Sequence, residues 1–177
     1  FKLHKMKIKK PFNLNHWIEE NRQFLKPPVG NKTIYDESSD DYIVMVVGGP
    51  NARKDYHYNE TEELFYQLEG EITIYVQEDG IKKAMKLGPG DMYLHPAKVP
   101  HSPARTEGSV GLVIERKRAG KGFNDGLLWF CDNCNHKLHE VYFELHDIEK
   151  DFLPHFSTFY NSEETRTCKK CGTVMET

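Results

Sequence analysis

The chain has 177 residues, of which 38% are hydrophobic, 29% charged and 12% aromatic, a composition typical of a folded globular protein and not of a disordered or collagen-like chain. Its 24 basic and 27 acidic residues give a net charge of −3, which excludes a broad basic surface for nucleic acid. The longest apolar run, residues 43–47, is far shorter than a membrane-spanning helix, so we expect no membrane partner.

The N-terminal part of the chain predicts a basic arm followed by one helix. Residues 1–10 lack the apolar segment and cleavage site of a secretory signal, and we expect them to be a solvated arm without function. Asn13 or Asn15 can cap a helix over residues 13–25, which Pro27 and Pro28 end. Its apolar side chains recur at helical spacing, at Leu14, Trp17, Ile18, Phe24 and Leu25.

The middle of the chain predicts short β-strands. Apolar or alternating runs occur at residues 42–47, 64–68, 72–77, 82–87, 91–95 and 111–115. Glycine- and proline-rich turn signals separate them, at residues 48–51, 69–70, 79–80 and 88–91. Such spacing is typical of a β-sandwich or jelly-roll barrel. Residues 147–160 predict a further helix, capped by Asp147 and kinked or entered at Pro154.

The four cysteines form two C-x-x-C pairs, Cys131 with Cys134 and Cys168 with Cys171. This pairing is typical of a closed structural metal site that binds zinc or rubredoxin-like iron. The alternative, two redox dithiols, is favoured by a thioredoxin-type βαβ context, and the sequence has none. Metal-binding thiolates indicate a reducing compartment, so we expect a cytoplasmic protein. We divide the chain into a barrel with its N-terminal helix, residues 11–120, and an extension with the cysteine site, residues 121–177.

Two further segments combine histidine, carboxylate, glycine and proline. They read His57-x5-Glu63-x6-Gly70 and Gly90-x5-Pro96-x4-His101. Here the chain resembles the cupin superfamily, in which the strands of a small barrel aim such residues into its mouth. Asn59 stands where the first cupin motif usually has a second histidine, and Lys98 where the second has glycine. The remaining two histidines and one carboxylate match the triad of non-haem Fe(II) oxygenases, which leaves positions open for substrate and dioxygen.

Two arginines and one acid lie near these motifs. Arg53 precedes the first histidine by four residues, and Arg105 follows the last by four. A guanidinium grips a carboxylate through two hydrogen bonds, so this pair indicates a substrate with a carboxylate. Glu115 could serve as a general base. The alternatives are exposed surface charges for the arginines and the solvated end of a strand for Glu115.

Longer stretches carry a narrower resemblance, to the 3-hydroxyanthranilate 3,4-dioxygenases in their single-cupin form with a rubredoxin-like C-terminal metal site. With the two cysteine pairs they extend from about Pro11 to Cys171. They are LKPPVGN at 25–31, VGGPNARKDYH at 47–57, ELFYQ at 63–67, VPHSPAR at 99–105, VIER at 113–116 and WFC at 129–131.

The resemblance implies two metal sites. His57, Glu63 and His101 would bind the catalytic Fe(II), and the four cysteines would hold a separate iron or zinc. His95 departs from expectation, because it occupies a strand position where we expect an apolar residue. It either ligates near the site, faces outward or makes a local hydrogen bond.

The resemblance also implies a substrate pocket. Arg53 and Arg105 would hold the substrate carboxylate, with Asn31 lining the pocket on a mobile loop. Glu115 would contact the substrate hydroxyl or amine and act as the base. Asp55 would orient a metal ligand or an arginine.

The activity implied is the opening of the ring of 3-hydroxyanthranilate by dioxygen. The product, 2-amino-3-carboxymuconate semialdehyde, would cyclise to quinolinate, in tryptophan catabolism and NAD biosynthesis. The resemblance also implies a homodimer. Two alternatives stay open: a cupin that senses or isomerises a small molecule, and an interaction protein whose functional part is the cysteine site.

Overall fold

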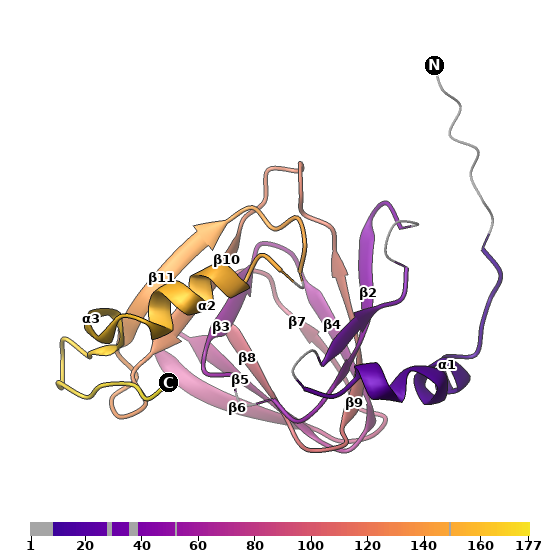
Figure 1. Ribbon diagram of the computed structural model, residues 1–177, viewed down its shortest axis with the longest axis horizontal. Coiled ribbons are helices and arrows are strands. Elements are labelled where there is room, and N and C mark those ends of the chain that lie inside the picture. Colours follow the sequence, from indigo (N-terminus) through magenta and orange to yellow (C-terminus); the bar gives the residue numbers. More distant parts are fainter. Residues whose placement is uncertain (1–8, 28–29, 36–38, 52, 149) are drawn as a thin grey trace.

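The structure is a computed structural model that describes residues 9–27, 30–35, 39–51, 53–148 and 150–177. Residues 1–8 of the expected arm at 1–10, and the expected helix stop at Pro28, lie outside the described residues. In the described part, two antiparallel sheets face each other (Figure 1). One has the order β1 (Asn31–Thr33), β2 (Tyr42–Gly48), β9 (Val110–Arg116), β4 (Glu63–Glu69) and β7 (Met92–His95). The other has the order β11 (Lys137–Phe143), β10 (Asp125–Phe130), β3 (Tyr56–Asn59), β8 (His101–Arg105), β5 (Ile72–Glu78) and β6 (Ile81–Leu87).

Both sheets place strands side by side that are distant in sequence, such as β2 with β9 and β3 with β10. This is the connectivity of a jelly roll, and it confirms the predominantly β, cupin-like fold. Alternating residues of the strands face inward and fill the space between the sheets. This core contains Met45, Phe65, Ile72, Ile74, Val76, Leu87 and Val113.

The first helix, α1 (Leu14–Asn21), is confirmed. The Asn13 side chain accepts a hydrogen bond from the backbone N–H of His16, as expected of an N-cap. A single 3₁₀ turn (Arg22–Phe24) follows, so the α-helix itself ends before the expected residue 25. Ile18 packs against Val46 and Val110, which attaches α1 to the five-stranded sheet. None of the helices in the described part of the chain has the length and apolar character that crossing a membrane requires.

The second predicted helix is shorter than expected. α2 (Leu153–Tyr160) begins six residues after Asp147, and no side chain caps it, so the expected cap at Asp147 is wrong. Pro154 lies in the first turn of α2, where the missing N–H has no helical partner in any case. Asp147 instead belongs to a turn closed by the bond from Asp151 N–H to its carbonyl. Entry at Pro154 is confirmed.

The C-terminal strands join the same barrel. β10 pairs with β3, and its residue Leu127 lies directly opposite His57. Strand β11 pairs with β10 and forms the edge of the six-stranded sheet. Helices α2 and α3 (Glu163–Arg166) lie beside these two strands (Figure 1). The expected division at residue 120 stays a prediction, although residues beyond it supply two strands to the six-stranded sheet.

Trp129 is the centre of the packing between β10 and α2. It is fully buried and stacks on Phe159 of α2, with ring centroids 4.3 Å apart and an interplanar angle of 13°. We expect Trp129→Ala to lower the free energy of unfolding by about 3–5 kcal/mol in denaturant titrations, because it leaves a large cavity. Leu153→Ala, at an exposed position of the same helix, is the control and is expected to have little effect. Equal losses in the two variants would contradict this description of the core.

Candidate active site

Two rows of titratable side chains face each other inside the barrel. On the six-stranded sheet, His57 of β3 is directly paired with His101 of β8. On the five-stranded sheet, Glu63 of β4 is directly paired with His95 of β7 on one side and with Glu115 of β9 on the other. Directly paired residues project from the same face of a sheet, and all five side chains are buried. The pairing of the strands therefore collects five titratable groups at one level of the barrel.

Three of these five groups form a candidate metal centre. His57, Glu63 and His101 each offer a ligand atom, and these atoms lie within 4.8 Å of one another. His101 Nε2 is 3.0 Å from Glu63 Oε2. The structure thus brings together the three residues that the cupin motifs indicated. Two imidazoles and one carboxylate form a donor set that suits non-haem iron and leaves coordination positions open.

The protonation states fit a metal as well. Burial alone would raise the pKa of Glu63, but its interaction with His101, through charge and a hydrogen bond, outweighs burial and lowers the pKa to about 2, so this carboxylate is ionised. Burial lowers the pKa of His57 and outweighs its hydrogen bond to Asp125. A neutral imidazole is the form that ligates metals. Asn59, which stands in place of the usual second histidine, donates a hydrogen bond to Glu63 Oε2 at 3.2 Å.

His95 does not belong to the metal centre. Its Nε2 donates to the carbonyl of Val99 at 2.8 Å, and its Nδ1 is 3.2 Å from the Tyr93 hydroxyl. The expected local hydrogen bond is therefore confirmed, whereas the outward orientation is wrong, because His95 is almost fully buried with its ring 4.3 Å from that of His101. Burial lowers the pKa of His95 to about 4, so it is neutral beside the triad.

Arg105 is a buried cation that has no acid partner among the described residues. Among the described residues its Nε has no hydrogen-bond partner, and its Nη1 reaches only the amide oxygen of Gln67, at 3.4 Å. Burial lowers its pKa to about 10. Gly111 makes room for it, since a Cβ at this position would lie 2.7 Å from Nη1. A buried, underpaired guanidinium favours an anionic ligand.

Glu115 lies across the interior from the histidines. The alternative that it is the solvated end of a strand is wrong, because β9 holds it fully buried next to Glu63. Its Oε2 accepts a hydrogen bond from Arg118, while Oε1 has no partner among the described residues. Burial, and then the charge of Glu63, raises the pKa of Glu115 to about 8 against the opposing charge of Arg118. Such a carboxylate can take up a proton near neutral pH.

Arg53 has a different environment from Arg105. It forms a two-pronged ion pair with the buried Asp55, with Nε 2.9 Å from Oδ1 and Nη2 2.5 Å from Oδ2. Its guanidinium also lies 5.6 Å from the ring centroid of Phe152 and 5.1 Å from that of Phe156, both at α2. Asp55 thus contacts the arginine and not a metal ligand, the second of the two possibilities considered from the sequence. Asn31 is the first residue of β1, where it pairs with Val47 of β2. The expectation that it lies within a loop is therefore wrong.

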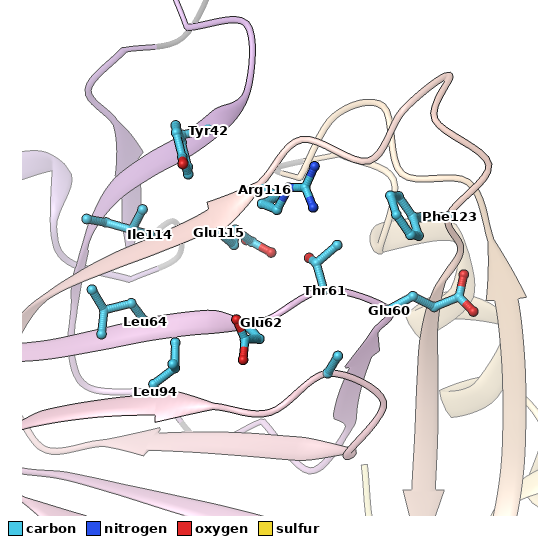
Figure 2. A pocket seen from close by; sticks show the side chains of 11 residues that line it. Tyr42, Glu60, Thr61, Glu62, Leu64, Leu94, Ile114, Glu115, Arg116 and Phe123 are labelled. Atoms are coloured by element: carbon cyan, nitrogen blue, oxygen red, sulfur yellow. The ribbon is translucent and has the colours of Figure 1, made fainter.

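A pocket of about 450 Å³ opens on the outer face of the five-stranded sheet and reaches Glu115 (Figure 2). Leu64, Leu94 and Ile114 form its apolar wall, and Thr61 lies beside Glu115. None of the three metal-centre residues lines this pocket. We therefore place the chemistry in the barrel interior and not in this pocket.

The chain is similar to proteins of known name over most of its length. The model of the 3-hydroxyanthranilic acid dioxygenase family matches residues 6–160. The 3-hydroxyanthranilate 3,4-dioxygenase of Xanthomonas euvesicatoria is 55% identical over 162 residues, which are 92% of this chain and 90% of that protein. The chain belongs to the 3-hydroxyanthranilic acid dioxygenase family.

The chain is also similar to a more distant named relative and to solved structures. The 3-hydroxyanthranilate 3,4-dioxygenase of Bacillus thuringiensis is 45% identical over 165 residues, 93% of this chain and 90% of that one. Among solved structures, a cupin-2 domain protein from Shewanella frigidimarina is 23% identical with a TM-score of 0.48, covering 59% of this chain and 93% of that one. The family match ends at residue 160 and therefore does not include Cys168 and Cys171.

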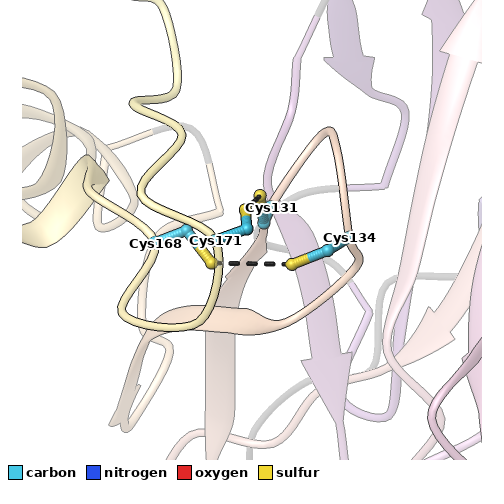
Figure 3. A group of neighbouring side chains, drawn as sticks. All are labelled: Cys131, Cys134, Cys168 and Cys171. Atoms are coloured by element: carbon cyan, nitrogen blue, oxygen red, sulfur yellow. Dashed lines mark hydrogen bonds between the residues drawn. The ribbon is translucent and has the colours of Figure 1, made fainter.

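The four cysteines of this 3-hydroxyanthranilic acid dioxygenase family member do converge (Figure 3). Cys131 Sγ lies 3.6 Å from Cys171 Sγ, and Cys134 Sγ lies 3.6 Å from Cys168 Sγ. A disulfide requires about 2.0 Å, whereas a tetrahedral site with metal–sulfur bonds of about 2.3 Å has sulfur–sulfur edges of about 3.8 Å. The donor set and its spacing therefore fit one tetrahedral zinc or iron ion.

The two C-x-x-C loops, called knuckles below, have similar backbone conformations. The residue after each second cysteine has a positive φ, 57° at Asn135 and 75° at Gly172, and each loop closes with a backbone bond to the carbonyl of its first cysteine. The Asn135 and Gln77 amides exchange two hydrogen bonds, which fasten the first knuckle to β5 of the barrel.

Sequence reasoning missed two residues that contact the candidate site of this family member. Asp125 Oδ1 is 2.7 Å from His57 Nε2, and Arg118 binds both Asp125 and Glu115. His57 and Asp125 are 68 positions apart, and neither Asp125 nor Arg118 lies in a metal-binding motif. Only the pairing of β3 with β10 brings them together, so no local signal could have found them.

Proposed function

We propose that the protein is a non-haem Fe(II) dioxygenase that opens the ring of 3-hydroxyanthranilate with O2. The product is 2-amino-3-carboxymuconate semialdehyde, which cyclises to quinolinate, and the reaction belongs to tryptophan catabolism and NAD biosynthesis. Membership of the family and the names of relatives over 90% of their length support this assignment. The observation that carries it is the buried, underpaired guanidinium of Arg105 within the same interior as a two-histidine, one-carboxylate centre.

In this proposal, His57, Glu63 and His101 hold the catalytic Fe(II). When bound, the ferrous ion supplies open coordination positions at which the substrate and dioxygen meet and exchange electrons. The chain keeps this region dry, since all three side chains are buried, and it supplies one ionised carboxylate against the charge of the metal.

Arg105 and Arg53 bind the substrate carboxylate in the barrel interior, with Asn31 at the edge of this proposed substrate site. Arg105 contributes more in this proposal, because it is buried and has no carboxylate partner in the part of the chain that the structure describes, whereas Arg53 is already paired with Asp55. Glu115 contacts the hydroxyl or amino group of the ring through its free Oε1 and takes up a proton there. Asp55 holds Arg53 in place.

Arg105→Ala is expected to lower kcat/KM by roughly 30- to 1,000-fold, or on the order of 2–4 kcal/mol of transition-state stabilisation. The physical reason is the loss of a desolvated charge partner for the substrate carboxylate. Arg53→Ala should have a smaller effect, because Arg53 is more exposed and shared with Asp55. Steady-state kinetics with 3-hydroxyanthranilate measures both changes. An unchanged kcat/KM in both variants would contradict the proposal that these two arginines bind the substrate carboxylate.

The proposed function itself is tested by product formation. The protein is supplied with Fe(II) under anaerobic conditions, mixed with 3-hydroxyanthranilate and exposed to air, while the ultraviolet spectrum and oxygen consumption are recorded. We expect one O2 consumed per ring opened, with a new ultraviolet band that decays as quinolinate forms. Oxygen uptake without ring opening, or no uptake with an iron-loaded triad, would refute the proposal.

The remaining assignments concern the surroundings of the active site. We assign a structural iron or zinc ion to the four cysteines, and a cytoplasmic location follows from the need to keep them reduced.

We also propose a homodimer, supported by the exposed apolar side chains of Tyr42, Met92 and Leu94 on the five-stranded sheet. Light scattering should give twice the mass of the chain, and a monomer at micromolar concentration would contradict it.

A further inference from the structure

Arg118 is a buried arginine outside all the motifs that the sequence offers. It follows β9 in the chain and is only 1% exposed. Its Nε and Nη2 donate to the two carboxylate oxygens of Asp125, at 2.8 and 2.7 Å. Its Nη1 donates to Glu115 Oε2 at 2.7 Å and to the carbonyl of Arg116 at 2.8 Å, with Thr61 Oγ1 at 3.4 Å. A buried cation is costly, and here two carboxylates offset the cost.

The contact with Asp125 determines which nitrogen of His57 carries the proton. Asp125 accepts from Arg118 with both oxygens, as an ionised carboxylate does, so it has no proton to donate. The 2.7 Å contact between His57 Nε2 and Asp125 Oδ1 must then be donated by His57. This leaves His57 Nδ1 without a proton, and therefore free to ligate a metal.

The contact with Glu115 orients the other side of the site. Arg118 binds Oε2 of this carboxylate, so Oε1 is the oxygen left without a partner among the described residues. One guanidinium thus holds a partner of a metal ligand with one edge and the candidate base with the other. Lysine cannot replace this geometry, because it is a point charge without the planar set of donors.

We infer that Arg118 is a positioning residue for the reaction, which fixes the ring of His57 through Asp125 and directs Oε1 of Glu115 toward the substrate. This inference rests on the proposed function, because it assigns the two groups that Arg118 holds to one reaction. It gives separate expectations for metal binding and for turnover. If Arg118 only stabilised the fold, its replacement would change neither metal binding nor turnover in a folded variant.

The test compares Arg118→Lys, Asp125→Asn and Glu115→Gln, with Arg116→Lys as the control at an exposed neighbouring arginine. The cysteine site is first filled with zinc, and Co(II) is then titrated while the visible absorption bands are followed. His57→Ala defines the absence of binding at the triad. Thermal unfolding shows that each variant is folded.

We expect Arg118→Lys and Asp125→Asn to bind Co(II) about 10- to 100-fold more weakly, as is usual when a partner of a metal ligand is lost. Glu115→Gln should bind Co(II) as the unmodified protein does and lose kcat. Arg118→Lys should also lose kcat in the iron-loaded enzyme, with little change in KM, because Arg105 is untouched. The control should match the unmodified protein in every measurement.

A folded Arg118→Lys with unaltered Co(II) affinity and kcat would overturn the inference. If Arg118→Lys does not fold, Asp125→Asn decides: unaltered Co(II) affinity overturns the inference, and weakened affinity supports it. Co(II) binding needs no substrate, so its outcome is separate from that of the proposed function. An unmodified protein that binds Co(II) at the triad and never opens the ring would refute the function alone.

Discussion

Replacing His57 with alanine is expected to abolish ring opening and to empty the candidate iron centre. The triad has two imidazoles and one carboxylate, and the loss of one ligand leaves two donors for a metal that typically has three protein ligands in such sites. The effect on activity should be the largest of any single substitution, because every later event needs the metal. Iron content by metal analysis and oxygen uptake with 3-hydroxyanthranilate measure the two consequences.

The control for this substitution is His146→Ala, which removes an imidazole from an exposed position. It should keep both the iron and the activity of the unmodified protein. Thermal unfolding checks the fold of His57→Ala. We expect this variant to be folded, because Asp125 retains its two hydrogen bonds to Arg118. Persistent Fe(II)-dependent oxygen uptake in folded His57→Ala would mean that the ligands are assigned wrongly.

Replacing the cysteines with serine is expected to affect stability more than chemistry. A closed four-thiolate site contributes its binding free energy to folding, so Cys131→Ser should lower the unfolding free energy by several kcal/mol. The first cysteine loop is hydrogen-bonded to β5 through Asn135 and Gln77. Cys131 directly follows β10, the strand that contributes Asp125 to the candidate active site. Activity per folded molecule should persist. Thermal unfolding with and without a strong chelator measures the effect.

Lys170→Ser is the matched control, because Lys170 is an exposed residue between the second pair of cysteines. It should unfold at the same temperature as the unmodified protein and respond equally to the chelator. A variant without all four cysteines that kept the native fold and thermal stability would show that the site is not structural. A specific loss of a binding partner with full stability would instead favour the interaction-protein alternative.

Runs of apolar or alternating residues predicted six strands of the described part, which are β2, β4, β5, β6, β7 and β9. They did not predict β1, β3, β8, β10 and β11. In β8, Pro103 interrupts the segment, and proline is normally excluded from inner strands. Yet β8 lies between β3 and β5 in the sheet. The start of α2 was also misplaced, because the carboxylate of Asp147 resembles a cap while Pro154 sets the actual first turn.

The three metal-centre residues could be predicted because local spacing encodes them: each motif places its ligand at a strand end. Asp125 and Arg118 could not, because their partners are set by strand pairing over long sequence separations. The environment of the two arginines was equally hidden. Arg53 and Arg105 look alike in the sequence, and only burial and the position of Asp55 distinguish the paired cation from the underpaired one.

The central claim is that His57, Glu63 and His101 hold one ferrous ion inside the barrel. The most direct test is anomalous X-ray diffraction at the iron absorption edge, from crystals prepared anaerobically with Fe(II). We predict an iron peak in contact with all three side chains, on the side of the interior that Glu115 and Arg105 share. No iron between these residues in crystals of an enzyme that still opens the ring would contradict the claim.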